Sequence, residues 1–240
     1  MFAFDHVWPY MGLGAALLLA LFLSTDILRN DRSVSRWQDL AWLAWLAWAG
    51  TLAYLLHQFE EHGIDAEGAH YAFRGFMCAT LGFPDARTCP VPLSYITSVN
   101  IAAVWLAGPA AALLGRRWPA VALSFFSIPF INFIGHIVPF LINGTYNPGV
   151  LTAILMFLPL SLWAFRVALV HYRLGWPTVL ATVFAGLALH AVLLLSVKAY
   201  IAGLIGIVAL DTIQVINPLI AGVIVFLAGQ RASRRDMTRG

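Results

Sequence analysis

Charged residues are scarce in this chain. Asp, Glu, Lys and Arg together make up 10% of its 240 residues, whereas soluble domains carry about 25%. Hydrophobic residues account for 61%, against about 45–50% in a soluble domain. These proportions exclude a water-soluble enzyme, a disordered chain and a nucleic-acid-binding protein. The net charge of +3 comes from short basic clusters between apolar blocks, and such clusters are typical of membrane topology signals, not of a surface for polyanions.

The apolar blocks follow one another without a hydrophilic insertion long enough to fold separately, so we expect one domain over residues 1–240. A membrane-spanning helix needs about 20 apolar residues. Runs of this kind predict an all-α, polytopic membrane bundle of seven transmembrane helices: Trp8–Leu28, Asp39–Glu61, Leu93–Leu114, Trp118–Ile142, Val150–Val170, Pro177–Val197 and Ile207–Leu227. The stretch 200–206 before the last run either lies in the interface or opens the final helix early. The first run lacks signal-peptide features and is expected to be retained.

Basic residues mark the cytoplasmic side of a membrane protein. With seven spans, 11 of the 14 Arg and Lys residues fall on one side: Arg29, Arg32, Arg36, Arg116, Arg117, Arg166, Arg173, Arg231, Arg234, Arg235 and Arg239. Only Arg74, Arg87 and Lys198 fall on the other. The distribution predicts an N-terminus outside and a C-terminus inside.

Cysteine is almost absent, and both cysteines, Cys78 and Cys89, lie in the longest predicted outer loop, Gly63–Pro92. We place the protein in a bacterial inner membrane, where the outer compartment is oxidising. A disulfide between the two is therefore favoured, and two free thiols are the alternative.

Ionisable residues gather near the outer ends of several predicted spans. A charged group inside a bilayer costs about 2.5–3.5 kcal/mol on insertion scales, so each one needs a partner or a purpose. The second span carries His57, Glu60 and Glu61, and the fourth carries Asn132 and His136. His190 in the sixth span is either a further ligand or a packing histidine. Asn100 and Asp211 are candidates for orienting the imidazoles, whereas His6, His62, His70 and His171 are expected in loops or at interfaces.

The spacing of these residues favours a metal site. Residues three and four apart share a helix face, so His57, Glu60 and Glu61 should project together and face His136. Two imidazoles with one or two carboxylates suit a divalent cation: zinc with an open position, or an iron or manganese pair bridged by carboxylate. Solvated glutamates beyond the end of the second helix are the alternative.

The stretch His57-Gln58-Phe59-Glu60-Glu61 resembles the bacterial membrane-protein family named for its HXXEE motif. The resemblance extends over roughly Leu40–Pro159, because Asn132, His136 and the turn Tyr146-Asn147-Pro148-Gly149 follow in order. It implies a shared buried His/Glu site but no assigned activity. His-Glu-x-x-His is absent, so metalloprotease chemistry is not carried over.

The first functional hypothesis is a membrane metalloenzyme that hydrolyses a lipid or another hydrophobic small molecule near the outer leaflet. His57, Glu61 and His136 would bind the divalent metal, zinc in preference to di-iron, with His190 or Glu60 as further ligands. Glu60 would alternatively act as general base, and Asn132 and Tyr146 would contribute polar groups to catalysis. A di-iron oxidase or desaturase and a proton- or cation-coupled transporter are the alternatives. The oligomeric state, and a binding subunit with a structural metal, stay open.

Overall fold

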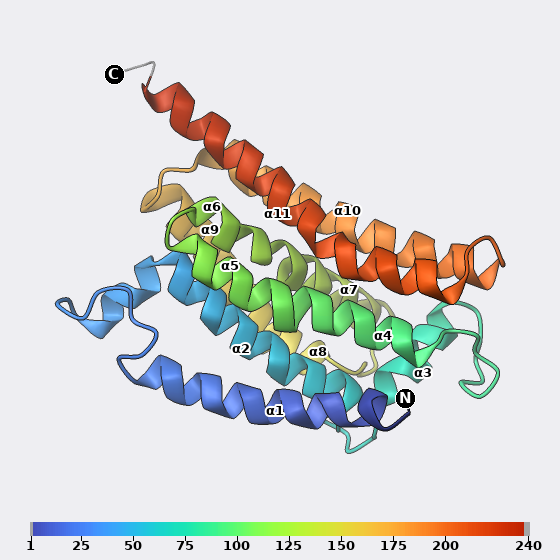
Figure 1. Cartoon of the computed structure of the whole chain (residues 1–240). Helices are drawn as coiled ribbons and strands as arrows, with labels where there is room; N and C mark the ends of the chain where they lie inside the picture. The colour runs from blue at the N-terminus through green and yellow to red at the C-terminus, as the bar shows by residue number, and fades with distance from the viewer. Residues whose placement is uncertain (1, 238–240) are drawn as a thin grey trace.

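The computed structural model describes residues 2–237, and Arg239 of the predicted inner cluster lies outside them. Within this range all regular secondary structure is helical, apart from one isolated bridge between Ile64 and His70. The predicted all-α membrane bundle is therefore confirmed. In Figure 1 the long helices run side by side, with the first one on the outside of the bundle and the last two together on the opposite side.

The helices follow the predicted spans with shifted ends. The single-helix spans are α1 (Phe2–Ser24), α2 (Leu43–His62), α10 (Gly175–Ile201) and α11 (Ile207–Met237). Three spans are interrupted: α4 (Leu93–Asn100) continues into α5 (Ala107–Gly115), α6 (Pro119–Phe125) into α7 (Ser127–Asn143), and α8 (Val150–Thr152) into α9 (Leu158–Val170). A short 3-10 helix, Arg36–Ala41, precedes α2. The stretch before α11 is a turn after the end of α10, so the last helix does not open early.

Among residues 2–237, six spans are long and apolar enough to cross a membrane; α2, the predicted second span, is not one of these six. Its 20 residues suffice in length, but the polar run from His57 to His62 lowers its hydropathy. It nevertheless packs between α1 and α5 inside the bundle (Figure 1). Seven spans and the N-out orientation therefore stay predictions.

Two spans contain a widened, π-helical turn, Ile101–Leu106 and Ala153–Phe157. Each precedes a proline, Pro109 or Pro159, by two or three residues. A proline has no N–H for the carbonyl four residues earlier, so the preceding turn loses its regular hydrogen bond and widens. Both turns flank the predicted site, because Asn100 immediately precedes one and Thr152 the other.

The predicted outer loop contains a helix that the sequence did not suggest, α3 (Ala72–Thr80). Its apolar side chains Phe73, Phe76 and Met77 recur at helical spacing, three and four residues apart. The disulfide between Cys78 and Cys89 is present and ties the end of α3 to the following loop, which confirms that prediction. Arg74 donates to the carbonyls of Ala86, Cys89 and Val91 and fixes the same loop.

Candidate metal centre

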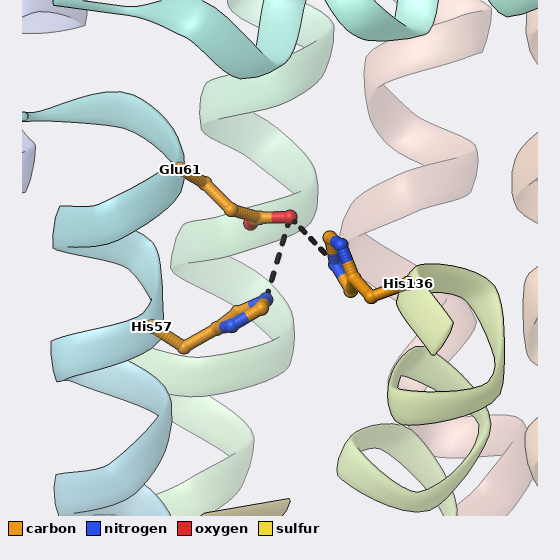
Figure 2. Close-up of side chains that lie close together, drawn as sticks. All are labelled: His57, Glu61 and His136. Atoms are coloured by element: carbon orange, nitrogen blue, oxygen red, sulfur yellow. Dashed lines mark ion pairs between the residues drawn. The ribbon is translucent and has the colours of Figure 1, made fainter. Parts of the chain in front are cut away.

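Three predicted ligands meet between α2 and α7. His57 and Glu61 lie one turn apart on α2, and His136 faces them from α7 (Figure 2). Oε1 of Glu61 lies 3.4 Å from Nε2 of His57 and 3.1 Å from Nε2 of His136. All three side chains are buried, with exposed fractions of 0%, 3% and 4% for His57, Glu61 and His136. We call these three residues the His/Glu cluster.

The orientation of the His136 ring is fixed by Asn147. Nδ1 of His136 lies 2.8 Å from Oδ1 of Asn147. The amide nitrogen of Asn147 donates to the backbone carbonyl of His136 over 3.0 Å, so its oxygen must be the atom that accepts from the ring. Nδ1 therefore carries the proton, and Nε2 of the neutral ring presents a lone pair to Glu61.

The His57 ring is fixed in the same manner by Thr152. Nδ1 of His57 lies 2.8 Å from Oγ1 of Thr152. The single hydroxyl proton of Thr152 points to acceptors, Oε2 of Glu60 and the carbonyl of Gly149. The hydroxyl oxygen can therefore only accept from Nδ1–H of His57, and Nε2 of this ring also presents a lone pair to Glu61.

Three electron-pair donors consequently converge on one point. Nε2 of His57 and Oε1 of Glu61 are buried and have no hydrogen-bond partner within residues 2–237. Such an arrangement needs a cation between the atoms, either a proton or a metal ion. Two His and one carboxylate form a known zinc set, and ligand atoms about 2.0–2.1 Å from a tetrahedral zinc stand about 3.3–3.4 Å apart. The two separations from Oε1 of Glu61, 3.4 and 3.1 Å, lie close to this spacing, and all three ligand atoms lie within 4.8 Å of one another. Hydrogen-bonded Nδ1 atoms are typical of metal-binding histidines.

Gly149 covers the cluster from the loop between α7 and α8. A Cβ at this position would lie 2.6 Å from Cε1 of His57, 2.8 Å from Cε1 of His136 and 2.9 Å from Cγ of Glu61. Its φ of +95° is also one that glycine tolerates best. The Asn-Pro-Gly turn thus packs its backbone directly on the candidate ligands.

The second oxygen of Glu61 contacts His62, a histidine expected in a loop or at an interface. Oε2 lies 3.3 Å from Nε2 of His62, which is buried. Asn100 contacts His62 and also accepts a hydrogen bond from Gln58. Asn100 therefore contacts an imidazole, as predicted, but that of His62. Gln58 and His62 are four residues apart, and this spacing was the signal for a second polar pair on α2.

Glu60 points away from the His/Glu cluster. Its carboxylate accepts from the backbone N–H groups of Leu151 and Thr152, from the Thr152 hydroxyl and from Tyr146. These donors occupy both oxygens at the start of α8. The expectation that Glu60 projects with Glu61 is not met, because neighbouring residues on a helix are turned by about 100° from each other.

The remaining predicted residues occupy three places. Tyr146 donates to Glu60 over 2.8 Å and accepts from the N–H of Ala66. Asn132 donates to the hydroxyl of Tyr54, and its own Oδ1 is buried without a partner in the described chain. Asp211 interacts with Ser94 near Asp5, at the ends of α4 and α1, so it does not orient an imidazole of the cluster.

A cavity of about 280 Å³ adjoins the cluster. Glu61, His62, Asn100, Asn132, His136 and His190 belong to its wall, which is otherwise mainly apolar. Nδ1 of His190 lies 2.8 Å from the carbonyl of Gly186 on the same helix and donates to it. His190 is therefore separate from the three ligand candidates in the described chain, and its Nε2 carries the lone pair.

The comparisons with known proteins agree with the predicted resemblance. The model of a family described as "Protein of unknown function with HXXEE motif" matches residues 48–164. The matched region includes all three residues of the His/Glu cluster together with Asn147, Gly149 and Thr152. No curated protein and no solved structure gave a significant match.

Proposed function

We propose that this chain, whose residues 48–164 carry the HXXEE-motif family region, is a membrane-embedded, metal-dependent hydrolase that acts on a lipid or another hydrophobic molecule. The observation that carries the proposal is the convergence of two imidazole lone pairs on one carboxylate oxygen beside an apolar cavity. The proposed location is the inner membrane of a bacterium, with the site near the outer leaflet.

Zinc is the metal that the donor set supports best. Among the described residues, the group that could hold an ion consists of His57, Glu61 and His136. A di-iron centre uses additional bridging carboxylates, and the carboxylate of Glu60 is occupied by four hydrogen bonds. One ion with three protein ligands leaves a position for water, as in catalytic zinc sites, where the metal supplies an activated water nucleophile near neutral pH.

The chain's own residues have distinct proposed roles around the cavity. We assign His190 the role of proton acceptor, because its unoccupied Nε2 belongs to the same wall as His136. In hydrolysis, water adds to the carbonyl carbon, the bond to the leaving oxygen or nitrogen breaks, and His190 returns the proton to that leaving atom. The unpartnered Oδ1 of Asn132 offers an acceptor for a polar group of the substrate.

A transporter is supported less well, because aromatic rings close the site on its predicted inner side. The ring of Phe157 packs on His57 with ring centroids 4.4 Å apart, and Tyr54 packs on Phe157 at 4.7 Å. Both Phe157 and Tyr54 belong to the main hydrophobic core. Alternating access needs a polar route to both faces of the membrane, whereas the described cavity adjoins the cluster from the side of α3, α7 and α10.

The decisive experiment measures bound metal in purified protein by elemental mass spectrometry. We expect stoichiometric zinc in the wild type and its loss in His57→Ala, His136→Ala and Glu61→Gln. His70→Ala is the matched control, because this exposed outer histidine lies outside the cluster. The same samples should release fatty acid from an ester-labelled phospholipid, and chelation should stop the release. Metal-free wild type after chelator-free preparation would contradict the proposal and leave a proton-bridged His/Glu cluster.

A further inference from the structure

The apolar cavity beside the cluster has a volume and a lining that a metal site alone does not explain. Its volume of about 280 Å³ is just below the usual range for ligand pockets, about 300–1,000 Å³. Most of its wall consists of aliphatic, aromatic and thioether side chains, among them Phe73, Phe76, Met77, Leu81, Val99 and Leu193. Such a wall suits a narrow hydrocarbon group attached to a single polar group.

The cavity begins where α7 and α10 separate. Deeper in the bundle the two helices touch, since a Cβ on Gly186 of α10 would lie 2.3 Å from the carbonyl oxygen of Ser127 on α7. Towards the outer side, Gly135 of α7 and Leu194 of α10 both line the cavity and are both exposed. The space between the helices is thus closed at the inner end and open at the level of Gly135.

Gly135 marks the opening. A Cβ on this residue would have no heavy atom within 4 Å, although the residue is in the middle of a helix, where glycine costs about 0.5–1 kcal/mol relative to alanine. The helix surfaces on both sides of the opening are apolar and exposed, with Val138 and Leu141 on α7 and Leu195 on α10. In a bilayer these surfaces face acyl chains, so the opening leads into lipid.

The outer side of the cavity is covered. Phe73, Phe76 and Met77 of α3 form this part of the wall, and the Cys78–Cys89 disulfide together with Arg74 fixes α3 to its loop. A hydrophobic ligand therefore has a lateral path from the membrane.

We propose that the cavity binds one hydrocarbon chain of a membrane lipid, which enters sideways between α7 and α10 past Gly135. The polar group at the end of the bound segment then lies at Glu61, His136 and His190. The small volume fits a single chain and leaves no room for a second one. The assignment of this hydrocarbon chain to the substrate rests on the proposed hydrolase function. The binding of the hydrocarbon chain in the cavity is independent of that function.

The test uses purified protein in lipid nanodiscs and palmitic acid that carries a photoactivatable diazirine. In the wild type we expect crosslinks to peptides from α3 and from the Leu189–Leu194 segment of α10. Gly135→Phe should remove these crosslinks by filling the opening, and Gly135→Ala should keep them. Gly14→Phe is the matched control, since Gly14 is also an exposed helical glycine with open space around its Cβ position.

Metal content is measured on the same preparations to separate the two proposals. Crosslinks that persist unchanged in Gly135→Phe, or that map only to lipid-facing surfaces such as α1, would overturn the lateral entrance. Specific crosslinks in a protein without metal would support the chain-binding cavity and refute the hydrolase. Loss of crosslinks in Gly135→Phe with unchanged metal content is the result expected if both proposals hold.

Discussion

Oγ1 of Thr152 lies 2.8 Å from Nδ1 of His57, although the two residues are 95 positions apart in the sequence. The same hydroxyl donates to Glu60, so a carboxylate, a hydroxyl and an imidazole form one hydrogen-bonded chain. This chain holds the His57 ring with its Nε2 lone pair towards Glu61. It links Glu60, the first glutamate of the motif, to the cluster indirectly, through a threonine in the short helix α8.

Removing the hydroxyl should therefore weaken metal binding without removing a ligand. In Thr152→Val the ring of His57 loses its acceptor, and we expect metal affinity to fall about 10–100-fold, as for other partners of metal-bound histidines. Competition with a fluorescent zinc chelator measures this change. Thr152→Ser keeps the hydroxyl and should bind metal like the wild type. Equal affinity of the valine variant and the wild type would show that the Thr152 hydroxyl does not position His57.

Substitution of Gly149 should displace the side chains of the His/Glu cluster, because Gly149 packs directly on them. Gly149→Ala combines an unfavourable φ of +95° with contacts below 3 Å to both histidine rings. Gly144→Ala is the matched control, because Gly144 also has a positive φ, of +66°, but has open space around its Cβ position. The control should lose only about 1–2 kcal/mol from the left-handed backbone conformation, whereas Gly149→Ala should also lose bound metal. Thermal unfolding and metal analysis of both variants decide this point, and indistinguishable variants would contradict it.

The two glutamates of the motif should respond differently to the same change. In Glu60→Gln an NH₂ group replaces an oxygen that accepts hydrogen bonds, so we expect a loss of about 1–3 kcal/mol in the free energy of unfolding with metal retained. Glu61→Gln should lose the metal. Burial, together with Glu60, raises the pKa of Tyr146, so its hydroxyl stays protonated and donates. Tyr146→Phe should accordingly cost about 0.5–1.5 kcal/mol.

Measurements of hydrolysis distinguish a structural role of Glu60 from a role as general base. If Glu60 were the general base, Glu60→Gln would abolish hydrolysis while leaving the unfolding transition unchanged. Denaturant titration monitored by tryptophan fluorescence, beside turnover of the ester-labelled phospholipid, separates the two roles.

Hydropathy and helical spacing were sufficient to predict the all-α bundle and the three residues of the cluster. His57 and Glu61 are four residues apart on one helix, and His136 lies in a second apolar helix. A spacing of four keeps two residues on one helix face even where the predicted helix boundaries are wrong by a few residues. Glu60 was assigned to the same face because a spacing of three also passes as one face. Whether such a residue joins the cluster depends on what lies beside it, and here the free N–H groups at the start of α8 attract its carboxylate.

The residues that orient the cluster could not be predicted in this way. Thr152 and Asn147 come from a loop and a helix start whose position depends on the tertiary fold, and a threonine near an apolar span has no distinctive pattern. The helix α3 was missed because a nine-residue amphipathic segment inside a polar loop resembles a loop by hydropathy. Asp211 was grouped with the site by depth alone, although α11 packs beside α4 and α10 on the other side of the bundle (Figure 1).

The Cys78–Cys89 disulfide gives a direct test of the predicted orientation. Disulfides persist in oxidising compartments and are rare in the cytoplasm, so its loop should face outward. In intact bacterial cells a charged, membrane-impermeant maleimide should label the protein only after treatment with an impermeant reductant. A single cysteine at the exposed position Ser35, introduced as Ser35→Cys in a Cys78→Ser/Cys89→Ser background, lies on the predicted inner side and should stay unlabelled until the cells are lysed. Labelling of this cysteine in intact cells would contradict the predicted orientation and would place the metal site near the cytoplasmic leaflet.

Loss of the Cys78–Cys89 disulfide should also lower the free energy of unfolding by about 2–4 kcal/mol. Because the loss would loosen α3 over the cavity, we also expect weaker retention of the hydrocarbon chain.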